Sequence, residues 1–174
     1  MTNEQLRAHN KNRKIQQIAW LTSNLEASMK AWVEILGIGP WNVYTFTDET
    51  VQDLRVGGKL VDEPFKFLIG ITHVGDMELE LIEPVYGPMI YQEYLQSKGP
   101  GLHHIKEQIS EHDFENVLAD YAGKGIAVTQ TGQFVRDFHF YLDTAPRLDF
   151  IYELGNCPVQ DLPPDMVTVY PPEK

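Results

Sequence analysis

Lys14–Glu26 reads KIQQIAWLTSNLE and Leu102–Asp113 reads LHHIKEQISEHD, and these two stretches decide the fold. A shift of 87 residues relates them and aligns three pairs of polar residues: Gln17 with His104, Ser23 with Ser110, and Glu26 with Asp113. Each stretch begins with a strand-like run and continues with a serine and, three residues later, an acid, which is the pattern of a helix start. The chain therefore contains two copies of one strand–helix unit.

The other ends of the two copies also match, at a shift of 73 residues. Met77–Leu81 reads MELEL and aligns with Phe150–Leu154, which reads FIYEL. Residues two apart on a strand share a face, and equivalent strands present their side chains from equivalent directions. Two copies related by a pseudo-twofold axis would therefore direct four polar side chains at one point: Gln17, Glu80, His104 and Glu153.

These four side chains have the chemistry of a metal site. An imidazole nitrogen and carboxylates are ordinary ligands of divalent cations, and the amide oxygen of Gln17 is a weaker, neutral one. The alternative is that Glu80 and Glu153 are solvated strand residues and that His104 is a core histidine. The repeat favours a site, because chance should not place polar residues at both equivalent pairs.

The composition bounds the class of protein. With 174 residues the chain has the length of one domain or of two fused small modules. The single cysteine, Cys157, excludes an internal disulfide framework and a CxxC metal site. A formal net charge of -11 argues against nucleic acid and anionic membranes as partners. No apolar run has transmembrane length, so we expect a cytoplasmic protein whose partner is a small-molecule substrate or ligand.

Hydrophobic periodicity and turn residues predict the remaining elements. Strands are expected at eight places: Lys14–Leu21, Trp41–Phe46, Phe65–Val74, Met77–Ile82, Leu102–Ile109, Ile126–Gln130, Phe134–Asp143 and Leu148–Leu154. Ser23 and Ser110 are expected to cap the two main helices, and Met29 and Trp32 lie on the predicted core stripe of the first. Asp48–Asp62 is polar and contains Gly57-Gly58, which predicts a loop with a short strand at most.

These elements divide the chain into five parts. They are an N-terminal arm at 1–13, a first βαβββ module at 14–84, a linker with a short helix at 85–101, a second βαβββ module at 102–155 and a proline-rich tail at 156–174. We expect the tail to run extended over the surface or over a partner chain. A Walker A loop, a dinucleotide fingerprint and a GxSxG elbow are missing from the sequence, which sets nucleotide-dependent and serine-hydrolase chemistry aside.

Three stretches resemble the vicinal oxygen chelate superfamily, which includes glyoxalase I, methylmalonyl-CoA epimerase, extradiol dioxygenases and bleomycin-resistance proteins. They are Lys14–Trp41, which ends in GIGPW, Val74–Pro84, which reads VGDMELELIEP, and Gly99–Ile105, which reads GPGLHHI. The resemblance is nearest to proteins related to methylmalonyl-CoA epimerase. It implies an α+β fold in which paired βαβββ modules form a cupped, barrel-like mixed sheet around a divalent metal. We also expect a homodimer.

The resemblance implies roles for the four polar residues. Glu80, His104 and Glu153 take the metal-ligand positions, with Gln17 as the fourth ligand, and the metal is one of Zn, Mn, Co, Ni or Fe. In epimerase-related members the metal stabilises an enolate while a carboxylate abstracts a proton beside a carbonyl group. By this resemblance the proton acceptor here is Glu153 or Glu80.

Two residues depart from the family pattern. Gln17 stands where members with a full metal shell usually have His, which weakens metal binding and disfavours a dioxygenase with two His and one carboxylate. Lys106 lies two residues beyond His104 on the same strand face, where metal-binding relatives generally carry a small residue. At an effective dielectric of about 20, an ammonium about 5 Å from a divalent metal costs about 6 to 7 kcal/mol. Occupancy by a metal therefore depends on how Lys106 is accommodated.

Lys106 admits two interpretations. Its stem curls out to water, or its ammonium replaces the cation and pairs with Glu80 or Glu153 in a metal-free cup. If a metal is also present, repulsion would lower the pKa of Lys106 and make it a general base or a carbonyl-binding amine.

Three functions fit these residues. The first is a metal-assisted isomerase, epimerase or lyase that acts on a small carbonyl compound through an enolate. The second is a metal-free enzyme in which Lys106 and a carboxylate do the acid–base work, and the third is a non-catalytic, resistance-type binding protein. Other residues receive simpler interpretations: solvated loop residue for Glu49, packing or edge residues for His73 and His139, and either pocket lining or core for Trp20, Trp41 and Tyr44.

Overall fold

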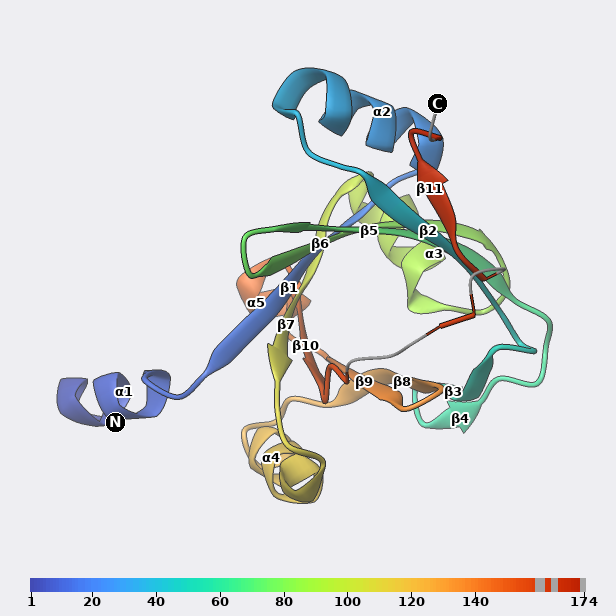
Figure 1. Cartoon of the computed structure of the whole chain (residues 1–174). Coiled ribbons are helices and arrows are strands. Elements are labelled where there is room, and N and C mark those ends of the chain that lie inside the picture. Colours follow the sequence, from blue (N-terminus) through green and yellow to red (C-terminus); the bar gives the residue numbers. More distant parts are fainter. Residues whose placement is uncertain (159–161, 164–165, 173–174) are drawn as a thin grey trace.

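The computed structural model describes residues 1–158, 162–163 and 166–172, and it shows one open mixed sheet (Figure 1). Within these residues the sheet has eleven strands: β1 (Lys14–Leu21), β2 (Trp41–Thr47), β3 (Val51–Val56), β4 (Lys59–Leu60), β5 (Lys66–Val74), β6 (Met77–Tyr86), β7 (Gly101–Gln108), β8 (Val128–Phe134), β9 (Asp137–Leu142), β10 (Ile151–Gly155) and β11 (Thr168–Tyr170). The helices are α1 (Asn3–Asn10), α2 (Leu25–Leu36), α3 (Ile90–Lys98), α4 (Phe114–Gly123) and α5 (Ala145–Leu148). The strand order is β11-β2-β5-β6-β1-β7-β10-β9-β8-β3-β4.

The two copies of the repeat meet at the centre of this sheet. β1 and β7 pair antiparallel, with Gln17 opposite Lys106 and Ala19 opposite His104, and the shift of 87 residues exchanges these two pairs. Each copy also contains one parallel pair, β1 with β6 and β7 with β10. The parallel registers repeat as well: Glu80 lies opposite Ala19, and Glu153 lies opposite Lys106. Strand register therefore confirms both shifts predicted from the sequence.

The sheet bends into a cup that stays open. In Figure 1, β2, β5 and β6 form an upper wall, β8, β9 and β3 form a lower wall, and β1, β7 and β10 connect them. β11 and β4 are the two edges of the sheet and do not pair with each other. The predicted α+β fold with a cupped mixed sheet is confirmed, but the sheet does not close into a barrel.

Asp48–Asp62 was predicted to be a loop with a short strand at most, but it holds two strands, β3 and β4. This segment crosses from the upper wall to the lower wall, where β3 pairs antiparallel with β8 and β4 pairs with β3. Val51 and Leu54 of β3 are buried in the core. The pairing with β8 shifts register between Gln52 and Arg55. This irregularity breaks the alternation of apolar and polar residues, so the sequence pattern does not indicate a strand.

The helix starts differ in detail from the prediction. α2 begins after Asn24, whose side chain accepts a hydrogen bond from the backbone N–H of Ala27 at 2.9 Å, so the predicted cap at Ser23 is wrong by one residue. Ser110 makes no side-chain cap either, and a 3₁₀ turn separates it from α4. The predicted end of α2 is confirmed, because Gly37 adopts a left-handed φ of 67°.

Two predicted strands have the wrong limits. Phe134–Asp143 was expected to be one strand, but it holds the end of β8, a turn with Val135 at a φ of 55°, and β9. Leu148 belongs to α5, and the last strand of the second copy begins at Ile151. In both places a tight turn interrupts the apolar run, and period-two alternation does not show where such a turn begins.

α2 covers the outer face of the upper wall. It buries Met29 against β5, where Gly70 leaves room: a Cβ at that position would lie 3.1 Å from Met29 Sδ. Trp32 packs edge-on against Trp20 and Trp41, with ring centroids 5.0 and 5.7 Å apart. The predicted core stripe is therefore confirmed. Trp20 and Trp41 belong to this outer core and not to the inside of the cup.

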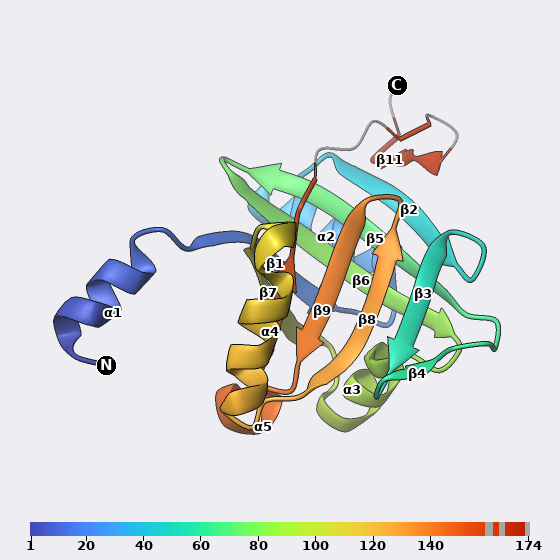
Figure 2. The ribbon, with the colours of Figure 1, turned by 90° about the horizontal axis from the view of Figure 1, so that it is seen from below.

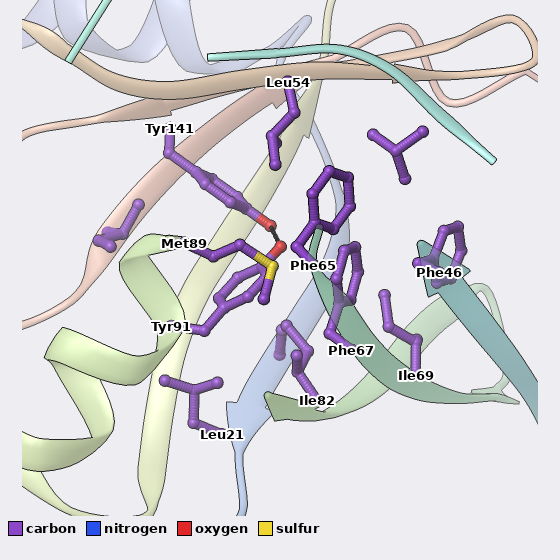
Figure 3. Close-up of a cluster of buried hydrophobic side chains, with 13 residues drawn as sticks. Leu21, Phe46, Leu54, Phe65, Phe67, Ile69, Ile82, Met89, Tyr91 and Tyr141 are labelled. Carbon is purple, nitrogen blue, oxygen red and sulfur yellow. Dashed lines mark hydrogen bonds between the residues drawn. The ribbon is translucent and has the colours of Figure 1, made fainter. Parts of the chain in front are cut away.

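A second hydrophobic core fills one end of the cup (Figure 3). It joins both walls through residues such as Phe67 and Leu54, together with Tyr91 from α3. The hydroxyl groups of Tyr91 and Tyr141 meet within it, with their oxygens 2.9 Å apart. Along β6 this core ends at Ile82. Toward the start of the strand, the remaining residues on the same face are polar. Burial of the cluster holds the walls together and leaves the other end of the cup for a cavity.

The ends of the chain leave the cup. α1 has no buried residues and stands clear of the sheet (Figure 2). In the proline-rich tail, β11 pairs antiparallel with β2, so this part of the tail is extended as predicted and lies on its own chain. Pro164 and residues 159–161 lie outside the described residues. In the described part of the chain, no helix is both long and apolar enough to cross a membrane.

Candidate active site

A cavity of about 490 Å³ lies inside the cup, between the two walls. Phe46 stacks on Phe67 with centroids 5.0 Å apart, and Phe134 meets Phe46 edge-on at 4.7 Å. These rings, with aliphatic side chains of β5, form the apolar side of the cavity. The polar side includes the side chains of Gln17, Glu78, Glu80, Lys106, Asp137, His139 and Glu153. The cavity therefore joins an aromatic slot to a charged surface.

Strand register explains why the polar side chains meet. Gln17 lies opposite Glu78 on β6 and opposite Lys106 on β7, and Lys106 lies opposite Glu153 on β10. Neighbouring strands are about 4.8 Å apart, so the four side chains form one row across four strands. They occupy the same face of the sheet, which is the inside of the cup.

Three of the four residues predicted from the repeat place an oxygen atom close to one nitrogen atom of the fourth, His104. His104 Nε2 lies 3.0 Å from Gln17 Oε1, 2.8 Å from Glu153 Oε2 and 3.3 Å from Glu80 Oε2. The other ring nitrogen, Nδ1, lies 2.9 Å from Nδ1 of His103, and both imidazoles are fully buried. The structure thus brings the sequence candidates together in direct contact.

His104 carries a positive charge in this setting. Burial lowers its pKa, but the carboxylates of Glu153 and Glu80 outweigh burial and raise the pKa to about 9. Burial and the neighbouring His104 hold the pKa of His103 well below its ordinary value, so that ring is neutral. His104 therefore donates from Nδ1 to His103 and from Nε2 to Gln17 Oε1, while the carboxylates of Glu80 and Glu153 lie beside Nε2 as ion-pair partners.

Lys106 is the second cation of the site. Its Nζ lies 3.1 Å from Glu153 Oε1 and 3.4 Å from both carboxylate oxygens of Asp137. The side chain is 6 % exposed and passes over Gly155, where a Cβ would lie 2.6 Å from Lys106 Cε. The interpretation that Lys106 curls out to water is therefore wrong, and its predicted pairing with Glu153 is confirmed.

Lys106 is protonated in this site. Burial lowers the pKa of Lys106, but Glu153 and Asp137 outweigh it, so the pKa lies well above its ordinary value. Lys106 is therefore an ammonium in this arrangement, and a deprotonated Lys106 beside a bound metal ion stays a prediction. Burial raises the pKa of Glu153, but Lys106 and His104 outweigh it and hold that pKa far below its ordinary value. Glu153 is therefore a carboxylate held between two cations.

Glu78 is a member of the row that the sequence analysis did not single out. Gln17 Nε2 donates to Glu78 Oε1, and His73 Nε2 lies 3.4 Å from Glu78 Oε2. Burial and the neighbouring carboxylate of Glu80 raise the pKa of Glu78. The repeat could not indicate Glu78, because its equivalent in the second copy is Ile151. Alternation along β6, which places it on the face of Glu80, is the signal that was available.

The remaining residues considered in the sequence analysis either line the cavity or lie in an exposed turn. Tyr44 and His73 line the cavity, and the His73 side chain is 60 % exposed at its rim. His139 also lines the cavity, and its ring packs against Tyr141 with centroids 5.1 Å apart, which agrees with its interpretation as a packing residue. Glu49 is exposed in the turn that follows β2.

As arranged, these residues do not fit a metal ion. Among the residues that the structure describes, no three or more His, Cys, Asp or Glu side chains form a group that could hold one. Instead, His104 Nε2 contacts the three oxygens directly, and Glu153 takes Lys106 as its second partner. The ammonium of Lys106 supplies a positive charge beside the carboxylate that a metal would use. The mechanism proposed below takes no step through a metal.

Comparison with known protein families gives one match. Residues 16–141 match the model of the Glyoxalase/Bleomycin resistance protein/Dioxygenase superfamily. This match covers most of the chain, including β6 and β7 and most of β1 and β9. Among curated proteins, none matches the chain.

Solved structures show the same fold at low sequence identity. A hypothetical protein, BH1468 from Bacillus halodurans C-125, has a TM-score of 0.60 and 16% identity, covering 88% of this chain and 100% of that one. A variant of Streptomyces coelicolor methylmalonyl-CoA epimerase in complex with 2-nitronate-propionyl-CoA has a TM-score of 0.57 and 18% identity, covering 86% and 98%. Methylmalonyl-CoA epimerase from Mycobacterium tuberculosis has a TM-score of 0.54 and 11% identity, covering 81% and 85%. At these identities the likeness shows the fold alone.

Proposed function

Since the chain belongs to the glyoxalase/bleomycin resistance protein/dioxygenase superfamily, we propose that it is a metal-independent isomerase or epimerase that moves a proton beside the carbonyl group of a small apolar compound. One observation carries the proposal. The ammonium of Lys106 is buried on the wall of the cavity, where Glu153 and Asp137 hold it. This is the position from which a cation stabilises the negative charge of an enolate.

Lys106 is the electrophilic group in this proposal. An ammonium has three N–H donors, and a carbonyl oxygen in the cavity accepts from one of them. As the neighbouring C–H bond loses its proton, negative charge develops on that oxygen, close to a cation that is already oriented. Glu153 and Asp137 position the ammonium. Removal of one such donor typically lowers the rate by about 10²- to 10³-fold.

We assign the proton acceptor to Glu78. The sequence suggested Glu153 or Glu80, but both contact the imidazolium of His104, and Glu153 also contacts Lys106. Lys106 and His104 hold the pKa of Glu153 far below its ordinary value, which makes Glu153 a weak base. Burial and Glu80 raise the pKa of Glu78, which brings it closer to the pH at which a carboxylate is an effective base.

The cavity favours a neutral substrate with a ring or a branched apolar body. Phe46, Phe67 and Phe134 provide an aromatic slot beside the charged row. Among the described residues that line the cavity, Lys106 is the one lysine or arginine, and two carboxylates already pair with it. Phosphate groups bind best to unpaired Arg and Lys side chains. We therefore propose a small carbonyl compound, although the similar epimerase from Streptomyces coelicolor is in complex with 2-nitronate-propionyl-CoA.

The proposal is tested by proton exchange in D₂O. The protein is incubated with a panel of aryl and alicyclic ketones and aldehydes, and incorporation of deuterium beside the carbonyl group is followed by NMR. We expect exchange with at least one of these compounds and a loss of about 100-fold or more in Lys106→Met and in Glu78→Gln. Lys98→Met, which removes a partly exposed lysine on α3, is the matched control and should exchange at the wild-type rate.

Two results would refute the proposal. One is the absence of exchange with every compound of the panel. The other is a wild-type exchange rate in Lys106→Met. A ligand that binds tightly and is recovered without deuterium would instead support the second candidate, a binding protein, which the stacked rings of Phe46 and Phe67 favour.

The homodimer expected from the sequence stays a prediction. Ile35 and Leu36, at the end of α2, are 78% and 60% exposed in the single chain, and apolar side chains of this kind are often covered in assemblies. Light scattering on the purified protein measures the assembly directly. A monomer at all concentrations would contradict the prediction.

A further inference from the structure

We propose that the proline-rich tail forms one side of the cavity and limits the size of the substrate that the site accepts. This inference rests on the proposed function. Two separate parts of the tail line the cavity: Cys157 and Pro158, which follow β10 closely, and Leu162. The match to the superfamily model ends at residue 141, so these side chains lie outside it. A substrate held between the two walls therefore meets a further surface, and the tail supplies it.

Asn156 holds the beginning of the tail in place. Its Nδ2 donates to the backbone carbonyl oxygen of Arg136 at 2.7 Å and to Glu111 Oε1 at 2.6 Å, and its Oδ1 accepts from the backbone N–H of Phe138 at 2.9 Å. Its own carbonyl oxygen accepts from Gln108 Nε2 at 3.0 Å. Hydrogen bonds from separate segments of the chain thus fix the point at which the tail leaves β10.

The next two residues bring the chain to the cavity. Cys157 has a left-handed φ of 47°, which residues with a side chain seldom adopt. Such a conformation costs energy and persists where the surrounding structure imposes it, as the hydrogen bonds of Asn156 do here. The ring of Pro158 then restricts its own φ. The backbone therefore sets the places of Cys157 and Pro158 on the cavity.

β11 holds the tail further along the chain. It pairs antiparallel with β2 of the upper wall, where Tyr170 lies opposite Trp41, and Tyr170 also packs against the outer core that contains Trp41. Figure 2 shows β11 at the end of the cup opposite α3. Since α3 supplies Tyr91 to the core that fills one end of the cup, the tail lies at the end that holds the cavity.

Leu162 is the side chain through which the tail selects a substrate. It is half-buried and lines the same cavity as the rings of Phe46, Phe67 and Phe134. An aryl group in the aromatic slot is therefore limited by a leucine on the side of the tail. Leu162→Ala leaves room for a larger substituent, and Leu162→Phe takes room away. One methylene group in an apolar pocket changes discrimination by about 10- to 200-fold, so these changes are large enough to measure.

The test compares two ketones of different size, propiophenone and 4-tert-butylpropiophenone. The Kd of each ketone is measured by isothermal titration calorimetry, and kcat/KM for deuterium exchange in D₂O is measured by NMR. We expect the wild type to favour propiophenone in both measurements. In Leu162→Ala the ratios of Kd and of kcat/KM should move toward the larger ketone by about 10-fold or more, and in Leu162→Phe they should move the other way.

Two further variants control for folding and test the anchor of the tail. Leu148→Ala shortens an exposed leucine on α5, away from the cavity lining, and both ratios should stay at their wild-type values. Asn156→Ala removes hydrogen bonds that fix the tail, and thermal unfolding checks that this variant is folded. Its ratios should move as in Leu162→Ala, and the change should appear in KM and not in kcat, because Asn156 positions the tail and does not act on the substrate.

Binding separates this inference from the proposed function. Unchanged ratios in Leu162→Ala would overturn the inference, and so would an equal loss of affinity for both ketones. Kd ratios that shift as expected in a protein that exchanges no deuterium would support the inference and count against the proposed function. Exchange with the same ratio in the wild type and in Leu162→Ala would support the proposed function and overturn the inference. If neither ketone binds or exchanges, both fail.

Discussion

The charge on His104 should make the stability of the fold depend on pH. In the folded protein Glu153 and Glu80 outweigh burial and raise the pKa of His104 to about 9, against an ordinary value of 6.5. A group whose pKa is higher in the folded state than in the unfolded state stabilises the fold. The stabilisation is complete at a pH below the unfolded-state pKa, and it is lost as the pH rises through the folded-state pKa. The difference between these two pKa values corresponds to about 3 kcal/mol. This contribution is present below pH 6.5 and is lost by about pH 9.

Urea unfolding at a series of pH values measures this effect. The comparison is between the wild type, His104→Gln, and His112→Gln as a control that changes an exposed histidine. The free energy of unfolding of the wild type, relative to His104→Gln, should fall by about 3 kcal/mol between pH 6.5 and pH 9, and His112→Gln should follow the wild type. Equal pH slopes for the wild type and His104→Gln would refute the assignment of a buried imidazolium.

Three further substitutions test the packing of the same region and one helix cap. Lys106→Met removes one of the two cations that hold the buried carboxylate of Glu153 and should lower the free energy of unfolding by about 3 kcal/mol, measured by urea unfolding; the double variant with Glu153→Gln should recover part of this loss. Gly155→Ala places a Cβ 2.6 Å from Lys106 Cε and should cost about 1 to 3 kcal/mol in the same measurement; an unchanged stability would contradict the packing of the lysine stem. Asn24→Ala should lower the thermal stability of the fold by about 1 kcal/mol, and Ser23→Ala should not, since Asn24 caps α2; the reverse order would restore the cap first expected.

The sequence predicted the fold where its signals are periodic and repeated. The shifts of 87 and 73 residues indicated which strands are equivalent, and the registers of Gln17 with Lys106 and of Glu80 with Ala19 follow them. β3 escaped prediction because it is held by pairing with β8, which is far away in the sequence, and because a register shift breaks its alternation. The division of the chain into modules at 14–84 and 102–155 stays a prediction.

The sequence predicted those residues of the site that occupy equivalent positions in the two copies of the repeat. His104, Gln17, Glu80 and Glu153 are found together, because equivalent strands meet at the centre of the sheet. The repeat did not predict Glu78 as a site residue, because the second copy has Ile151 at the equivalent position. His139 and the direction of Lys106 depend on space that glycines leave on neighbouring strands, and a sequence does not show which glycine will face which side chain.

The central claim is that the ammonium of Lys106 stabilises the enolate without a metal. The most direct test is the rate of deuterium exchange by protein that has been treated with a chelator and shown by elemental analysis to be free of divalent metal. We expect this protein to exchange at the rate of untreated protein, and we expect Lys106→Met to exchange about 100-fold or more slowly. An exchange rate that disappears with the metal and returns when a divalent cation is added would contradict it.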